Sequence, residues 1–189
     1  TSDDTDFSTG LAGLFYGEKN PSPTDAAKIS LWAWAAHRVM DYAETIDSLD
    51  MNSSVVCGHS RLGKTALLTA ATDERFAGAF VNGSGCGGAS ITREKLGEDV
   101  AEICQNFPQW FCENYKKYRG KEEDMPFDQH YLVASIAPRP VLVSSAIGEH
   151  DPLSEMLTCI AASPQYKNCG VPGFISDDRV PQIGDHFHQ

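Results

Sequence analysis

The chain has 189 residues, which suits one domain of ordinary size, and its 41% hydrophobic and 22% charged residues are typical of folded proteins. Fifteen basic and 26 acidic residues give a formal net charge of −11, which argues against partners such as nucleic acid or an anionic membrane surface. No apolar run reaches the ~20 residues that a membrane-spanning helix needs.

Six cysteines stand at positions 57, 86, 104, 112, 159 and 169, and no two of them form a Cys-x-x-Cys motif. This spacing does not indicate a zinc or redox site. An even number is compatible with disulfides in an oxidising compartment and also with buried thiols, so the pairing stays open.

Helix-like and strand-like segments alternate along the chain. Residues 1–23 are rich in Gly, Pro, Ser and Asp and are expected to form a loop, with Thr24-Asp25 as a helix cap. Apolar residues at three- and four-residue steps predict helices, and short apolar runs predict strands. The expected helices are 24–50, 61–72, 129–136 and 153–162, and a mixed helical region covers 92–124. The expected strands are 55–57, 77–81, 141–143 and 182–188.

This order predicts one α/β domain over residues 1–189, with a mostly parallel sheet and helices on both faces. The turn at Ser60 stands out within it, because a short strand ends at Gly58 and a helix begins at Arg61. That pattern is typical of the nucleophile turn of α/β-hydrolases, in which small residues let strand and helix approach closely. Here the second glycine comes one position late, at Gly63. A plain strand-to-helix turn with a capping serine is the alternative.

A carboxylate follows the strand that ends near Ala146. Asp151 is the candidate for the acid of a catalytic triad, with Glu149 as the alternative, because the acid belongs after a later strand than the nucleophile in this fold. The competing interpretation is an exposed acidic turn.

Residues 58–67, Gly-His-Ser-Arg-Leu-Gly-Lys-Thr-Ala-Leu, resemble the nucleophile motif of the glucuronoyl esterases, carbohydrate esterase family fifteen of the α/β-hydrolase superfamily. In that family the serine is followed by Arg, a variable residue, Gly and Lys, which accounts for the late glycine. The likeness continues in order through residues 73–77, 84–89, 97–98, 107–111, 128–130 and 137–141.

The resemblance implies a serine carboxylesterase that hydrolyses glucuronate esters between xylan and lignin through an acyl-enzyme, with no metal and no organic cofactor. It makes Ser60 the nucleophile and places Arg61 at the oxyanion. It also makes Lys64 and Glu98 sugar-binding residues, for which ordinary surface side chains are the alternative. Trp110 is either a stacking platform for the substrate or part of the core.

Three departures from the family pattern matter. Some members carry the acid where this chain has Gly83, which moves that role to Asp151 or Glu149. No tryptophan follows this second acid, so a different substrate preference is expected. The catalytic histidine follows the last strand in similar sequences and is expected beyond Gln189, because His186 and His188 are interpreted as strand residues.

We therefore expect a fragment, truncated at both ends, with little activity by itself. The resemblance also implies a carbohydrate or uronic-acid ester substrate, a monomer, and a secreted or periplasmic location. The alternatives are an acetyl-xylan or other carbohydrate deacetylase on the same fold, and a non-catalytic carbohydrate-binding relative.

Overall fold

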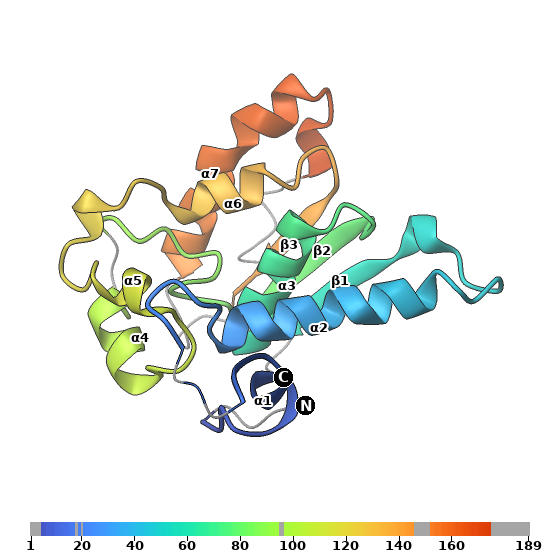
Figure 1. Cartoon of the computed structure of the whole chain (residues 1–189). Helices are drawn as coiled ribbons and strands as arrows, with labels where there is room; N and C mark the ends of the chain where they lie inside the picture. The colour runs from blue at the N-terminus through green and yellow to red at the C-terminus, as the bar shows by residue number, and fades with distance from the viewer. Residues whose placement is uncertain (1–4, 18, 20, 95–96, 146–151, 175–189) are drawn as a thin grey trace, which may run out of the picture.

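A computed structural model describes residues 5–17, 19, 21–94, 97–145 and 152–174. Its centre is a parallel sheet of three strands in the order β1-β2-β3 (Figure 1). The strands are β1 (Val55–His59), β2 (Gly78–Asn82) and β3 (Val141–Ser144). All three were expected from the sequence, and their ends differ from the prediction by at most two residues. The fourth expected strand, 182–188, lies outside the described residues.

The helices are α1 (Gly10–Tyr16), α2 (Lys28–Ala43), α3 (Arg61–Thr72), α4 (Val100–Asn106), α5 (Glu113–Lys116), α6 (Gln129–Ala134) and α7 (Pro152–Asn168). Helix α3 connects β1 to β2 and helices α4 to α6 lie between β2 and β3, as parallel pairing requires, whereas α1 and α2 precede β1 and α7 follows β3. Short 3₁₀ turns occur at Met51–Ser53, Glu122–Asp124 and Pro172–Phe174. The helix expected at 61–72 is confirmed at both ends, whereas α1 falls in a segment expected to be a loop.

Helix α2 begins later than the sequence predicts. Its N-cap is Ala27, which offers no side-chain acceptor, and the expected cap at Thr24-Asp25 is not used. Instead, the amides of Lys28 and Ile29 donate to the carbonyl oxygens of Gln109 and Trp110 at 3.1 and 3.4 Å. The open N-terminal amides of this helix are thus satisfied by a segment eighty residues away.

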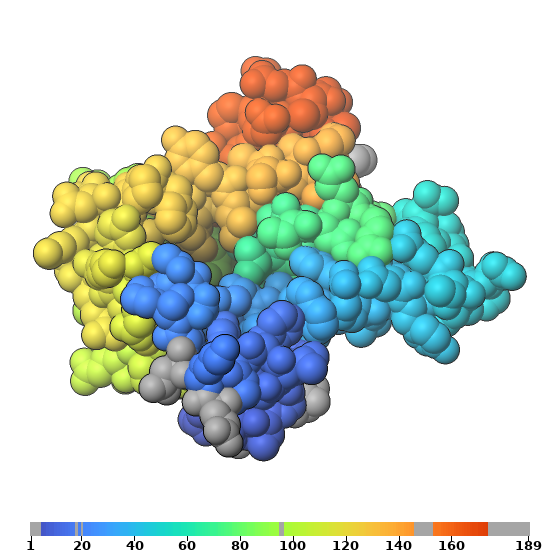
Figure 2. Space-filling model, in the orientation of Figure 1, coloured from blue at the N-terminus to red at the C-terminus, as the bar shows by residue number. Residues whose placement is uncertain are grey.

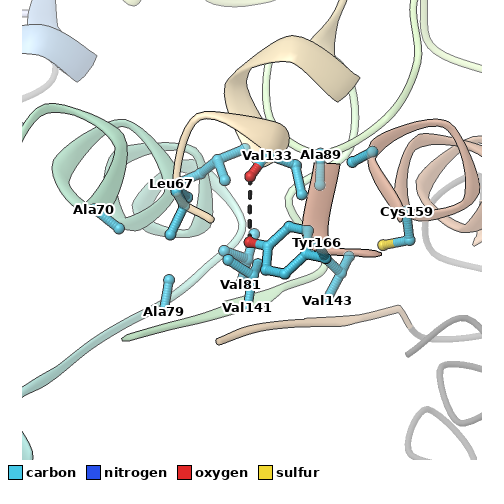
Figure 3. Packing of buried hydrophobic residues seen from close by; sticks show 12 residues of the cluster. Leu67, Ala70, Ala79, Val81, Ala89, Val133, Val141, Val143, Cys159 and Tyr166 are labelled. Atoms are coloured by element: carbon cyan, nitrogen blue, oxygen red, sulfur yellow. Dashed lines mark hydrogen bonds between the residues drawn. The ribbon is translucent and has the colours of Figure 1, made fainter. Parts of the chain in front are cut away.

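The main core lies between the sheet and three helices, and Figure 3 shows α3, α6 and α7 on the same side of the strands. Its buried residues are Leu67, Ala70, Ala79, Val81, Ala89, Val133, Ile136, Val141, Val143, Cys159, Ala162 and Tyr166. Phe80 and Leu142 alternate to the opposite face of the sheet and are only half-buried. The parallel pairing of the three described strands, with helices before, between and after them, confirms the predicted α/β class.

Two further structural observations concern the cysteines and the helices. Within the described part of the chain, no disulfide joins any of the six cysteines. None of the helices described is long and apolar enough to cross a bilayer.

Candidate active site

Ser60 occupies a strained turn between β1 and α3. Its backbone has φ 55° and ψ −125°, in the positive-φ region that residues other than glycine rarely adopt. The Ser60 amide donates to the carbonyl of Asn82 at 3.0 Å, which ties the turn to the end of β2. The Ser60 carbonyl accepts from the Lys64 amide at 3.2 Å and so begins the helix. This geometry matches the sharp strand-to-helix turn that the sequence predicts at Ser60.

Two glycines allow this turn to form. A Cβ atom at Gly58 would lie 2.0 Å from the Leu62 carbonyl oxygen, and one at Gly63 would lie 3.0 Å from the Asn82 carbonyl oxygen. The close approach of α3 to β2 therefore falls at position 63, whereas Leu62 has a side chain that is 52% exposed. This explains why the second glycine of the motif comes one residue late.

Two cations of α3 lie close to one aromatic ring. The guanidinium of Arg61 and the ammonium of Lys64 are 5.9 and 5.8 Å from the centre of the Trp110 ring, within cation–π range. Trp110 is 4% exposed and stacks on Phe107 at 3.9 Å with an interplanar angle of 3°. Trp110 therefore belongs to the buried core, and its ring also lies within cation–π range of both cations.

Burial distinguishes these two cations. Arg61 is exposed beside Ser60, whereas Lys64 is only 3% exposed and donates from its ammonium to the Ser84 carbonyl. The surface position considered for Lys64 from the sequence therefore does not occur. A buried ammonium is costly unless hydrogen bonds or an opposite charge compensate for it.

A cavity of about 510 Å³ opens beside these residues, between α2, α3 and α6, and Figure 2 shows the hollow there. Its walls are mostly apolar and are formed by Ile29, Ser30, Lys64, Leu68, Gly87, Trp110, Phe111, Cys112, Tyr115, Phe127, Gln129, Tyr131, Leu132 and Ser135. Neither Ser60 nor Glu98 is among the lining residues, so this cavity adjoins the nucleophile turn and does not contain it.

Glu98 lies in the connection from β2 to α4 and is half-buried. The residue after it, Asp99, forms a capping box with Glu102, whose amide donates to the Asp99 carboxylate at 2.8 Å. Earlier in the same connection, the Thr92 amide and hydroxyl both donate to the buried Asp128 carboxylate at 2.8 Å. The described residues on both sides of Glu98 are therefore anchored.

The acid of the predicted triad falls where the structure gives no description. Asp151 and Glu149, and likewise His186 and His188, lie outside the described residues. Gly83 has φ 50°, and its amide donates to the Ser144 carbonyl at 2.7 Å, which extends the contact between β2 and β3. Within the described ranges, no group of three or more His, Cys, Asp or Glu side chains is arranged to hold a metal ion.

Sequence reasoning missed Glu155, a fully buried carboxylate near this end of the sheet. It lies on the buried stripe of α7, where positions 155, 159, 162 and 166 recur at helical spacing and all are at most 1% exposed. Burial raises the pKa of Glu155, while hydrogen bonds from Gly85 and Ser84 act in the opposite direction. An acidic residue in an otherwise apolar stripe was the signal available in the sequence.

A parallel sheet with a strained serine turn between a strand and a helix defines the α/β-hydrolase class. A family model described as glucuronyl esterase, fungi, matches residues 2–170. The chain belongs to the glucuronyl esterase family.

Curated relatives support this assignment. The chain is 41% identical over 177 residues to carbohydrate esterase MZ0003 from an unknown prokaryotic organism, covering 90% of this chain and 41% of that protein. It is 32% identical over 200 residues to 4-O-methyl-glucuronoyl methylesterase 1 of Wolfiporia cocos, covering 98% of this chain and 47% of that protein. The chain thus spans less than half the length of these relatives.

Solved structures agree. A glucuronoyl esterase from Solibacter usitatus matches with a TM-score of 0.80 and 43% identity, over 85% of this chain and 42% of that one. A mutant glucuronoyl esterase from Sporotrichum thermophile, in complex with methyl 4-O-methyl-β-D-glucopyranuronate, matches with a TM-score of 0.73 and 28% identity. That match covers 79% of this chain and 44% of the other.

Proposed function

We propose that the protein to which this chain belongs is a serine carboxylesterase that hydrolyses esters of glucuronic acid. The observation that carries the proposal is the strained Ser60 between β1 and α3, followed by Arg61 and Lys64, in a chain of the glucuronyl esterase family. The named relatives include 4-O-methyl-glucuronoyl methylesterases and a structure with a methyl glucuronate bound.

The chemistry proceeds in two steps. The Ser60 hydroxyl attacks the ester carbonyl while a histidine base accepts its proton, and the alcohol leaves as the acyl-enzyme forms. Water then attacks the acyl-enzyme, which releases glucuronic acid and restores the Ser60 hydroxyl. Asp151, or alternatively Glu149, is proposed as the carboxylate that orients the histidine.

Helix α3 supplies the electrostatic part of this mechanism. Amides in the first turn of a helix point out of its N-terminus, and Arg61 also carries its own positive charge there. Arg61 is proposed to stabilise the oxyanion with both groups. Lys64 and Glu98 are proposed to hydrogen-bond the sugar hydroxyls. Because Lys64 is almost fully buried, a hydroxyl that reaches it is shielded from water, which strengthens the bond.

We also propose that the protein acts as a monomer and uses neither a metal nor an organic cofactor. The proposal also places the enzyme outside the cytoplasm, in a secreted or periplasmic location, where polymeric plant cell-wall substrates are met.

The test is an assay of the full-length protein on methyl 4-O-methyl-glucuronate and on an acetylated xylo-oligosaccharide. We expect release of methanol from the first substrate, and Ser60→Ala to lower that rate by ~10³-fold or more. Ser53→Ala serves as the matched control, because Ser53 is an exposed serine in the 3₁₀ turn before β1, and it should keep the rate within about twofold. An unchanged rate in Ser60→Ala would refute the assignment of the nucleophile.

A second candidate is a carbohydrate deacetylase on the same fold. It is favoured by a structural match, with 41% identity and a TM-score of 0.78, to a protein described as a promiscuous esterase of carbohydrate esterase family fifteen from a marine bacterial metagenome. Acetyl release without methanol release would support this alternative. The absence of both would support a non-catalytic carbohydrate-binding protein.

A further inference from the structure

A buried polar network lies behind the nucleophile turn. Lys64, Ser84, Ser145 and Glu155 are each at most 3% exposed. One carboxylate oxygen of Glu155 accepts from the Ser84 hydroxyl and from the Gly85 amide, both at 2.8 Å. The other oxygen accepts from the Ser145 hydroxyl, and the Lys64 ammonium donates to the Ser84 carbonyl. A single carboxylate thus receives three hydrogen bonds in the protein interior.

These contacts join four parts of the fold. Ser84 and Gly85 follow β2, Ser145 follows β3, Lys64 belongs to α3, and Glu155 lies in the first turn of α7. A negative charge in the first turn of a helix is stabilised by the helix dipole. The carboxylate of Glu155 therefore connects the carboxyl ends of two neighbouring strands with the helix that begins at the nucleophile.

Charge balance points to Lys64 as the electrostatic partner of Glu155. Burial raises the pKa of the Glu155 carboxyl, and the positive charge of Lys64 acts against that rise. Lys64 is itself buried, one helical turn after Ser60. Because an isolated buried charge is strongly disfavoured, each of the two groups lowers the cost of keeping the other ionised.

We propose that Glu155 is a positioning residue: it holds the Lys64 ammonium and the Ser84–Gly85 turn where the sugar of the substrate binds. The proposal rests on the proposed function, since it gives Lys64 the role of a sugar-binding residue. Glu155 itself is not assigned a contact with substrate, and it acts through Lys64 and Ser84.

The first test is a double-mutant cycle on stability in the full-length protein. Glu155→Gln retains the side-chain shape and removes the charge, Lys64→Met removes the ammonium, and the double variant removes both charges. Each substitution changes the unfolding equilibrium constant by some factor. We expect the factor for the double variant to be smaller, by about fivefold or more, than the product of the factors for the two single variants. Glu113→Gln and Lys116→Met, an i,i+3 ion pair whose Glu113 side chain is 60% exposed, form the control cycle and should be close to additive.

If Glu155→Gln alone fails to fold, the double variant decides. Recovery of the fold when Lys64→Met is added would support the proposal, because the buried cation that has lost the negative charge of Glu155 is then removed. Failure of the double variant as well, or an additive cycle, would overturn the pairing with Lys64.

The second test separates substrate binding from catalysis. On methyl 4-O-methyl-glucuronate, we expect Glu155→Gln to raise KM about fivefold or more while kcat changes less than about threefold, and the double variant to have the KM of Lys64→Met alone. If the KM of the double variant changes by the product of the changes seen for Glu155→Gln and Lys64→Met, the two residues act independently and the proposal is overturned. If Ser60→Ala keeps its activity, the proposed function fails, while the stability cycle still reports on Glu155.

Discussion

At the scale of single residues, the nucleophile turn depends on contacts between backbone atoms. Gly58 faces the Leu62 carbonyl so closely that any side chain at position 58 overlaps with the helix backbone. Backbone of this kind cannot move aside as a flexible side chain can. The geometry of Ser60 is thus determined by its neighbours more than by its own side chain.

We therefore predict that Gly58→Ala destabilises the protein by about 3 kcal/mol or more, since its Cβ would lie 2.0 Å from the Leu62 carbonyl oxygen. Urea unfolding measures the effect. Gly173→Ala is the matched control, because nothing lies within 4 Å of a Cβ at that position, and it should change stability by less than about 0.5 kcal/mol. Equal effects of the two substitutions would contradict the structure of the turn.

Residue roles were only partly predictable from the sequence. Ser60, Arg61 and Lys64 were found because they lie within five residues of one local motif, and the strained backbone at Ser60 confirms the turn. The near-complete burial of Lys64 was not predictable, because it depends on Trp110 and Ser84, which come from distant segments. The assignments of Asp151, Glu149 and Glu98 stay predictions.

At the scale of elements, helix α2 is attached to the end of α3 through Arg75. The Arg75 guanidinium lies 2.9 Å from Asp41 and 2.6 Å from Glu44, both in or just after α2. It also bonds the buried carboxylate of Asp73, the C-cap of α3, at 2.9 and 2.7 Å. Hydrogen bonds from Arg75 hold the pKa of Asp73 below its usual value.

This pairing predicts a dependence of stability on pH. A carboxyl whose pKa is lower in the folded state contributes stability above its unfolded pKa, and that contribution is lost as the pH falls through the folded pKa. Asp73→Asn should therefore cost about 1.5 kcal/mol at pH 7, with a smaller difference from the parent protein in acid. Unfolding curves at pH 7 and at about pH 3 measure both values.

Glu74→Gln is the control for that experiment, since Glu74 is the exposed carboxylate next to Asp73. It should change stability little at either pH. A constant penalty for Asp73→Asn across the whole pH range would show that its effect is one of packing and not of charge.

Helices were predicted correctly where the contacts that stabilise them are local in the sequence, and incorrectly where those contacts come from distant segments. Helix α3 was predicted at both ends because its signals, a turn before Arg61 and Ala/Leu periodicity through Thr72, are local. The predicted start of α2 is wrong because the first amides of this helix are capped by the carbonyls of Gln109 and Trp110, and no local sequence pattern reveals that contact. Helix α7 continues past residue 162 because Tyr166, further along, is fully buried and donates to the Val133 carbonyl (Figure 3).

At the scale of the whole molecule, the described part of the sheet has one central strand and two edge strands. β2 pairs on both sides, whereas β1 and β3 each pair only with β2 among the described residues. Val55 at the start of β1 is 56% exposed, which is unusual for a valine of a parallel sheet. A strand with one unpaired side offers its backbone groups to solvent or to another strand.

We predict that hydrogen exchange will be faster at Val55, Cys57 and His59 than along β2. Because successive amides of a strand point to opposite sides and the Ser60 amide points to β2, these three point away from it. Exchange followed by NMR or mass spectrometry on the 189-residue chain measures the difference. Protection equal to that of β2 would contradict the prediction and would indicate that a further strand pairs with β1.

The displacement of the motif glycine to position 63 has a practical consequence for protein engineering. Gly58 contacts the backbone of Leu62 and not its side chain, and that side chain is half exposed, next to Arg61. Residue 62 is therefore a position where a saturation library can vary an exposed side chain next to Arg61 while the backbone turn at Ser60 is preserved. Directed evolution of the proposed ester preference has a starting point at this position.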